Sequence, residues 1–175
     1  MDPLRERWII PMLTSAKNRT MTDIKYKDLE QGSTATPFSR FFWAAWKDDW
    51  TTAEAQLADD IEWDMMSNNQ IRKGKADVLP FLKASKYASA KEPVPIFNRA
   101  EKEWGVWEYW NVGTIEPSIA EFAKQSGWPF PADVSTIIGK KYKVPVCFIY
   151  HINAQGQIDV VREYLDVGSV IAQFK

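Results

Sequence analysis

The sequence predicts an α+β domain in which one curved, mixed but mostly antiparallel sheet wraps round three N-terminal helices. Two observations support this fold class. Apolar residues recur at helical spacing between residues 37 and 85, whereas strand-like alternation dominates from residue 93 onward. Three helices cannot cover the whole concave face of such a sheet, so its open end is predicted to be a pocket.

Composition narrows the possible partners. The chain has 175 residues, enough for one domain with a core, and its aromatic share of 14% includes nine Trp. So many large rings indicate either a bulky core or a pocket lined with them. Lys and Arg total 22 against 23 Asp and Glu, so no strong field favours nucleic acid or an anionic membrane. Neither partner is expected.

Cysteine and histidine are scarce. Cys147 and His151 are the single representatives of their types, which excludes an intrachain disulfide and disfavours a zinc site of His and Cys ligands. We predict no metal and no cofactor. The apolar run near the N-terminus is short and interrupted by Pro11, unlike a signal or membrane-spanning segment. A cytoplasmic protein is the expectation.

The chain divides into an extension and one domain. Residues 31–37 (QGSTATP) resemble a linker, so 1–34 are predicted to be an N-terminal extension and 35–175 the domain. Met21 is an alternative start, which the sequence leaves open.

Three helices are expected before the long strands. Thr36 and Pro37 resemble an N-cap and a first-turn proline, and they open a helix over 37–49. Its apolar face consists of Phe38, Phe41, Phe42, Ala45 and Trp46. Thr51 or Thr52 is predicted to cap a second helix, which extends to Ala58. The third covers 75–85, and the helix proper is predicted to start near Ala76 to Leu79, because Pro80 is tolerated only in a first turn. Its inward side chains are predicted to be Val78, Leu79 and Leu82.

Four strands follow the alternation of a half-buried sheet. The first, 60–66, places Ile61, Trp63 and Met65 on one face, and 71–74 forms a short edge piece. Two longer strands are predicted over 93–101 and 105–115. On the latter, Trp107, Tyr109 and Asn111 share one face.

Residues 139–167 read as a final hairpin. Asn153 to Gly156 form its turn, between a first run rich in β-branched and aromatic residues and a second run from Ile158. Strict alternation along the second run places Asp159, Val161, Glu163, Leu165 and Val167 on one face. Glu163 is therefore a carboxyl flanked by apolar neighbours, which is the main chemical clue in the chain.

An inserted segment, 116–138, interrupts the strands. It combines a short helix from Pro117 to Lys124 with an aromatic loop over 127–131 that contains Trp128. Such a segment either acts as a lid over the pocket or packs passively over the sheet edge, and both readings stay open.

Three stretches together resemble the nuclear transport factor 2-like superfamily, more narrowly its SnoaL-like and limonene-epoxide-hydrolase-like enzymes. They are 41–66 (FFWAAWKDDWTTAEAQLADDIEWDMM), 71–82 (IRKGKADVLPFL) and 157–173 (QIDVVREYLDVGSVIAQ), the last resembling a terminal strand. The resemblance implies a cystatin-like α+β barrel that forms a homodimer or higher oligomer through its convex sheet face, toward which Arg162 and Tyr164 are predicted to point. Members include isomerases, cyclases, dehydratases, epoxide hydrolases, cofactor-free lyases and non-enzymatic binding proteins.

This chain has the family's residue type at some catalytic positions and a different type at others. Glu163 falls where the epoxide hydrolases place the acid that activates water, but the Arg-x-Asp partner position reads Tyr109, Trp110 and Asn111. The ketosteroid isomerase base, an Asp late in the first strand, is replaced by Met65. Some dehydratases use histidines in the cone, whereas His151 lies beside the hairpin turn.

These residues define a predicted site. Apolar surroundings raise the pKa of a carboxyl, so Glu163 can act as a general acid or base. Tyr109 can donate to a developing oxyanion, and Asn111 can orient Glu163 or the substrate. A structural role for Glu163 remains open. The predicted substrate-binding side chains are Trp63, Met65, Trp107, Phe41, Trp46, Val161, Leu165 and Trp128.

The predicted function is a cofactor-independent lyase or isomerase that acts by proton transfer, including retro-aldol C–C cleavage, on a bulky aromatic or polycyclic small molecule. Two alternatives remain. One is an epoxide hydrolase with an altered triad, and the other is a non-catalytic module that binds a hydrophobic ligand or a protein.

Overall fold

The computed structural model describes residues 36–175, and it confirms the α+β fold class. The predicted extension over 1–34 and the alternative start at Met21 lie outside the described residues. The elements run in the order α2 (Pro37–Trp46), α3 (Trp50–Ala55), β1 (Leu57–Met65), β2 (Gln70–Lys73), α4 (Lys75–Tyr87), β3 (Ser89–Glu101), β4 (Trp104–Ile115), α5 (Ile119–Ser126), a 3-10 helix (Val134–Ile137), β5 (Lys141–Ile152), β6 (Ile158–Leu165) and α6 (Val167–Ala172).

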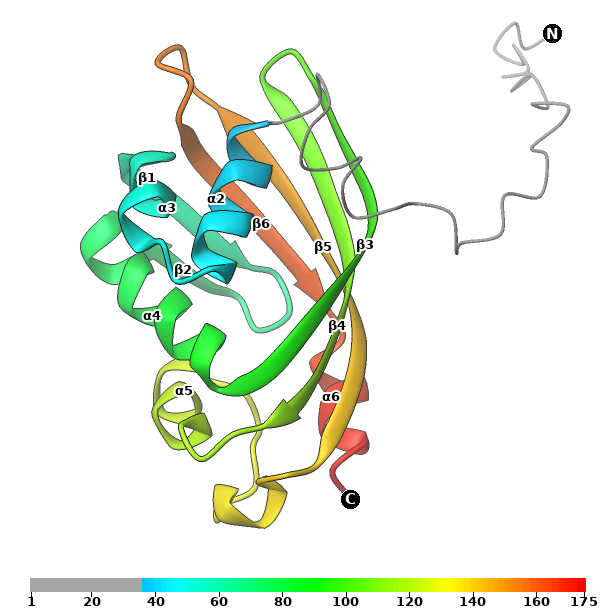
Figure 1. The fold of residues 1–175 in the computed structure, drawn as a ribbon. Coiled ribbons are helices and arrows are strands. Elements are labelled where there is room, and N and C mark those ends of the chain that lie inside the picture. The colour runs from blue at the N-terminus through cyan, green and yellow to red at the C-terminus, as the bar shows by residue number, and fades with distance from the viewer. Residues whose placement is uncertain (1–35) are drawn as a thin grey trace, which may run out of the picture.

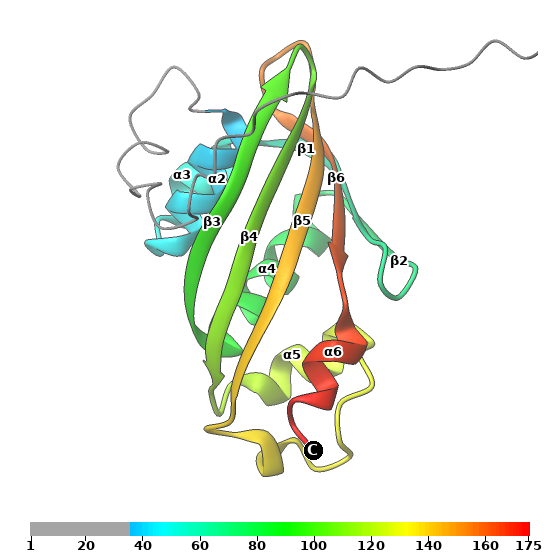
Figure 2. The ribbon, with the colours of Figure 1, turned by 90° about the vertical axis from the view of Figure 1, so that its right-hand side faces the viewer.

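One six-stranded sheet organises these elements, in the order β2-β1-β6-β5-β4-β3. Only the β1–β6 pair is parallel among its neighbouring strands. Figure 1 shows α2, α3 and α4 on one side of the sheet, with α5 and α6 near its lower end. Figure 2, turned by 90°, shows the long strands β3, β4 and β5 curving past these helices.

Helix α2 begins as its capping signal predicts. The Thr36 side chain accepts a hydrogen bond from Ser39 N at 3.1 Å, and Pro37 occupies the first turn. The fully buried ring of Phe38 then stacks on Tyr150 of β5, with 4.7 Å between ring centroids. This contact joins the first helix to the centre of the sheet.

The second helix differs from the prediction at both ends. Asp49 is its N-cap, because its carboxylate accepts from Thr52 N at 3.0 Å, and neither Thr51 nor Thr52 has that role. Helix α3 ends at Ala55, and Ala58 already belongs to strand β1.

Helix α4 runs through Pro80, which the prediction had placed in the first turn. The helix begins at Lys75, so Pro80 lies beyond the first turn. Pro80 is exposed, as is Ala76, whose carbonyl loses its helical partner and can bond to water instead. Proline is tolerated here because no buried carbonyl is left unpaired.

Strand β3 begins at Ser89, four residues before the predicted start at Pro93. Prolines cannot donate to a ladder, but β3 is the edge of the sheet, where Pro93 and Pro95 are tolerated. The earlier start aligns Lys91 with Gly113 of β4. It thereby adds Lys91 to the sheet, next to the predicted site.

The final hairpin forms as predicted, but a bulge in it turns the side chain of Asp159 to the face opposite the predicted one. Gly156 N donates to Asn153 O at 2.9 Å in the turn. The register shifts between His151 and Ile152, so Asp159 has no opposite partner and its carboxylate meets His151 instead. The prediction that Asp159 shares the face of Glu163 is therefore wrong.

A further helix follows the last strand. The Asp166 carboxylate accepts a hydrogen bond from Ser169 N at 3.0 Å and caps helix α6. The resemblance had implied a strand over these residues, and strict alternation had placed Val167 on the strand face of Glu163. Both expectations are wrong, because Val167 is the first residue of α6. The capping carboxylate stabilises a helix over this short stretch. On the opposite, convex face of the sheet, Arg162 is exposed and Tyr164 is 37% exposed. Assembly through this face stays a prediction.

Candidate functional site

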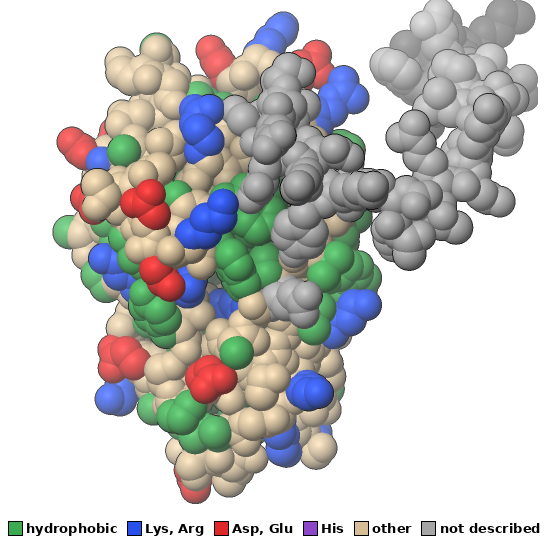
Figure 3. Space-filling view, viewed as in Figure 1, with side chains coloured by type: hydrophobic (Ala, Val, Ile, Leu, Met, Phe, Trp, Pro, Cys, Tyr) green, Lys and Arg blue, Asp and Glu red, His purple; other side chains and the backbone are tan. Residues whose placement is uncertain are grey.

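A cavity lies between the helices and the sheet. Its volume is about 130 Å³. Its walls are mainly aromatic, and Figure 3 shows hydrophobic side chains gathered between α2 and β3 on the face seen there. The aromatic walls predict an apolar ligand.

Most of the predicted site residues border this cavity. They are Glu163, Tyr109, Asn111, Phe41, Trp46, Trp63, Leu165 and Trp128. Met65, Trp107 and Val161 are instead buried in the core, with at most 2% of each exposed, and they are not among the described residues that line the cavity. Trp107 is covered by Phe42, whose ring centroid lies 5.1 Å away.

Glu163 is held by an indole. Trp63 Nε1 donates to Glu163 Oε2 at 2.8 Å. The parallel pairing of β1 and β6 brings these side chains together, because it aligns Trp63 with Val161 and Met65 with Glu163. Burial raises the pKa of Glu163, while the hydrogen bond from Trp63 and the charge of Lys91 act against that rise. The second carboxyl oxygen has no hydrogen-bond partner among the described residues.

Tyr109 supplies a free hydroxyl. Its ring stacks on Phe148 with centroids 6.0 Å apart, and the residue is 8% exposed. Within the described part of the chain, no hydrogen bond engages the hydroxyl. Burial raises the pKa of Tyr109 well above its usual range, and the charge of Glu163 adds to this effect. Tyr109 therefore stays protonated at neutral pH and can donate to a ligand.

Asn111 belongs to a separate hydrogen-bond chain. Tyr142 Oη donates to Asn111 Oδ1 at 3.2 Å and lies 2.7 Å from Ser89 Oγ. Gly113 provides the space, because a Cβ there would lie 2.9 Å from the Tyr142 hydroxyl. Burial raises the pKa of Tyr142 to about 12, although both hydrogen bonds oppose the rise. Asn111 thus contacts Tyr142, while no hydrogen bond joins it to Glu163 among the described residues.

Lys91 is the functional candidate that the sequence reasoning missed. It borders the cavity, and its Nζ donates to the carbonyl oxygen of Ser85 and, at 3.3 Å, to Ser85 Oγ. Burial lowers the pKa of Lys91 to about 8; the charge of Glu163 opposes this and that of Lys86 assists it. Alternation extended back from Pro93 would have placed Ser89 and Lys91 on the sheet, but the strand was predicted to start only at Pro93.

His151 lies outside the cavity. Its Nδ1 is 2.6 Å from Asp159 Oδ1, its Nε2 is 3.6 Å from Glu103 Oε2, and its ring centroid is 4.8 Å from that of Trp104. Asp159 is the main cause of a raised pKa at His151. Over residues 36–175, no three His, Cys, Asp or Glu side chains gather in a way that could hold a metal. No helix in that range is long and apolar enough to cross a membrane.

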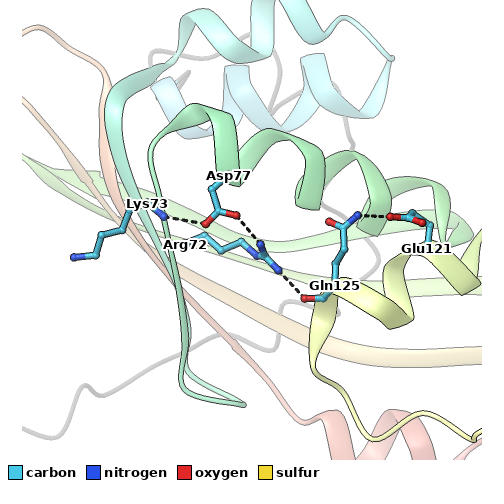
Figure 4. A network of polar contacts seen from close by, with 5 residues as sticks. All are labelled: Arg72, Lys73, Asp77, Glu121 and Gln125. Atoms are coloured by element: carbon cyan, nitrogen blue, oxygen red, sulfur yellow. Dashed lines mark hydrogen bonds and ion pairs between the residues drawn. The ribbon is translucent and has the colours of Figure 1, made fainter.

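The inserted segment forms part of the cavity wall. Trp128 and Phe130 line it, with ring centroids 5.6 Å apart. Arg72 ties the preceding helix α5 to the rest of the domain, as Figure 4 shows: its guanidinium donates to Asp77 at 2.7 Å and to the Gln125 carbonyl at 2.6 Å. The helix is thus anchored at its C-terminal end, next to Trp128.

Comparison with proteins of known structure identifies the fold of this chain. No protein-family model and no curated protein matches the chain. A candidate polyketide cyclase from Xanthomonas campestris pv. campestris matches with a TM-score of 0.63 and 21% identity, over 79% of this chain and 94% of that one. An NTF2-like protein from Burkholderia xenovorans LB400 matches with a TM-score of 0.60 and 17% identity, over 79% and 93%.

An LEH-like epoxide hydrolase from M. tuberculosis is also similar, with a TM-score of 0.57 and 17% identity over 79% of this chain and 86% of that one. Identities this low show the shared architecture and leave the reaction open. The chain therefore has the nuclear transport factor 2-like fold, with the mixed, mostly antiparallel curved sheet of that fold.

Proposed function

We propose that the protein is a cofactor-independent enzyme that moves a proton on an aromatic small molecule, with Glu163 as general acid or base. The observation that carries this proposal is the state of the Glu163 carboxyl. One oxygen is held by Trp63, the other is free, and the group borders an aromatic cavity. A carboxylate in such surroundings is poorly solvated and therefore more basic than one in water.

The neighbouring groups suit the charge that develops in such a reaction. When Glu163 removes a proton next to a carbonyl or another acceptor, negative charge moves onto an oxygen of the substrate. Tyr109 remains protonated and can donate to that oxygen. A base and a donor in one apolar cavity support isomerisation, β-elimination or retro-aldol cleavage. Such a pair of groups is what a lyase or isomerase of this kind needs.

Cavity size limits the substrate. A volume of about 130 Å³ suits a molecule with one or two rings better than a larger polycyclic one. The aromatic walls favour a flat, apolar body with a polar group directed at Glu163 and Tyr109.

Similar structures support an enzyme without choosing its reaction, since they include a candidate cyclase and an epoxide hydrolase. Epoxide hydrolysis with an altered triad is the weaker alternative. Tyr109 and Asn111 stand where the resemblance places Arg and Asp, and Asn111 is engaged by Tyr142.

The test uses 5-nitrobenzisoxazole, a bicyclic compound that opens to a coloured phenolate when a poorly solvated base removes its ring proton. We expect the wild-type protein to accelerate this opening and Glu163→Gln to lose at least about 100-fold of the effect. Glu62→Gln is the matched control, because Glu62 pairs with Lys73 at the surface and lies outside the cavity wall.

Equal rates for wild type and Glu163→Gln would refute the general-base role. If the compound also bound to both proteins with the same affinity, the cavity would be a non-catalytic binding site.

A further inference from the structure

Lys91 is a cavity amine for which residues 36–175 provide no counter-ion. Its described hydrogen-bond partners are the two neutral oxygens of Ser85, and no carboxylate of the described residues lies within 4.0 Å of its Nζ. Lys86 also borders the cavity but pairs with Asp48 at 3.1 Å. Within the described part of the chain, Lys86 is thus paired with an acid, whereas Lys91 is not.

The position of Lys91 places it with the other polar groups of the site. It aligns with Gly113 of β4, the residue that makes room for the Tyr142 hydroxyl. The charge of Glu163 reaches both Lys91 and Tyr109. An amine, a carboxyl and a phenol therefore surround one small aromatic space.

We propose that Lys91 Nζ condenses with an aldehyde or ketone group of the substrate, so that the cavity is a site for an aryl carbonyl compound. This inference rests on the proposed function for the proton transfer that follows the condensation. An uncharged lysine in an apolar site is a nucleophile for carbonyl carbons.

The charged and titratable groups around Lys91 are compatible with an uncharged amine. Burial and the charge of Lys86 favour loss of its proton, Glu163 opposes it, and Tyr109 and Tyr142 remain neutral phenols at pH 7. With a pKa of about 8, about one-tenth of Lys91 is uncharged at pH 7, against about one in 3,000 for an ordinary lysine with a pKa of 10.5.

The condensation balances without another reactant. The Nζ lone pair attacks the carbonyl carbon and forms a C–N bond, which gives a carbinolamine. Protonated Glu163 then gives a proton to the hydroxyl group of the carbinolamine. The C–O bond breaks, water departs, and a protonated imine remains. The imine withdraws electrons from the adjacent carbon, so the Glu163 carboxylate can then take a proton from that carbon. The enamine formed in this way takes the proton back from Glu163, at the same or a conjugated carbon, and hydrolysis of the resulting imine by water returns the carbonyl product and the free amine.

Reductive trapping tests the condensation directly. The probe is 2-naphthaldehyde, added with sodium cyanoborohydride, whose hydride converts an imine into a stable secondary amine. Intact-mass measurement and peptide mapping locate the label. We expect one naphthylmethyl group, at Lys91, and a labelling rate that rises with pH around a midpoint near 8.

Two variants and one control sharpen the result. Lys91→Met and Lys91→Arg should both lose the label; the arginine variant keeps the positive charge but forms no imine under these conditions. Lys73→Gln, at an exposed lysine outside the cavity wall, should keep the label on Lys91. The proposal is overturned if the label spreads over surface lysines without preference for Lys91, or if either Lys91 variant is labelled at that peptide like the wild type.

This outcome is separable from that of the proposed function. The nitrobenzisoxazole has no carbonyl group and cannot form an imine, so its opening tests Glu163 independently of condensation. Loss of opening in Glu163→Gln without trapping at Lys91 would remove only the present inference. Trapping at Lys91 without Glu163-dependent opening would remove only the general-base role.

Discussion

Trp63 Nε1 donates to Glu163 Oε2 at 2.8 Å, between two strands that run parallel although the residues are 100 positions apart in the chain. The bond favours the ionised carboxyl and so lowers the pKa of Glu163 relative to burial alone. It also leaves the other carboxyl oxygen free for a ligand. A core tryptophan therefore limits how far burial raises the pKa of Glu163.

Trp63→Phe tests this relationship. Without the indole donor, the pKa of Glu163 should rise further, so the pH at which nitrobenzisoxazole opening reaches half its maximum should move upward. The variant should also lose about 1–3 kcal/mol in the free energy of unfolding, because a buried acceptor loses its partner. A pH–rate profile and urea unfolding measure both effects. An unchanged profile would show that Trp63 does not control the carboxyl.

Glu163→Gln should change how stability depends on pH. The folded-state pKa of Glu163 is raised, so its contribution to stability is fully present below the unfolded pKa and is lost as pH rises through the folded pKa. Wild-type protein should weaken over that window, and the glutamine variant should not. Urea unfolding at several pH values from 4 upward compares the two, with Glu62→Gln as the surface control. Parallel curves for wild type and Glu163→Gln would contradict a raised pKa.

Lys91→Met should have the opposite pH signature. The folded-state pKa of Lys91 is lowered from 10.5 to about 8. The contribution of its amine to folding stability is therefore fully present above the unfolded pKa and is lost as pH falls through the folded pKa. Wild-type stability should rise between about pH 8 and 10.5, and this rise should disappear in the variant. At pH 7 the methionine variant should be more stable by about 1–3 kcal/mol, reduced by solvent that reaches the cavity.

Unfolding in urea at pH 7 and at pH 10.5 provides the measurement for Lys91→Met. A variant that is equally destabilised at both values would contradict a lowered pKa at Lys91.

Arg72→Ala should release helix α5. The Arg72 side chain bonds to Asp77 and to the Gln125 carbonyl, and its guanidinium lies 4.5 Å from the ring centroid of Phe81. Removing it should cost about 1–3 kcal/mol and should speed amide hydrogen exchange in α5. Lys73→Ala is the matched control, because that side chain is largely exposed. Exchange in α5 that is equally fast in wild type and variant would show that Arg72 does not anchor the helix.

Local patterns predicted much of the fold because they depend on near neighbours. The cap at Thr36 and the turn at Asn153 form through contacts a few residues apart. Alternation along β4 also placed Tyr109 and Asn111 correctly on the cavity side. The same reasoning failed at Asp159, because a bulge shifts the register there, and at the end of the chain, where Asp166 caps a helix.

The sequence by itself determined the fold class, the aromatic character of the interior and the presence of one carboxyl among apolar neighbours, since burial and strand period are local properties. Only the tertiary structure decided the composition of the site. Strand order made β3 an edge that tolerates prolines and brings Lys91 to the cavity. It also paired Glu163 with Trp63 and covered Trp107 with Phe42. These contacts join residues distant in sequence, and only the way the sheet and helices pack can bring them together.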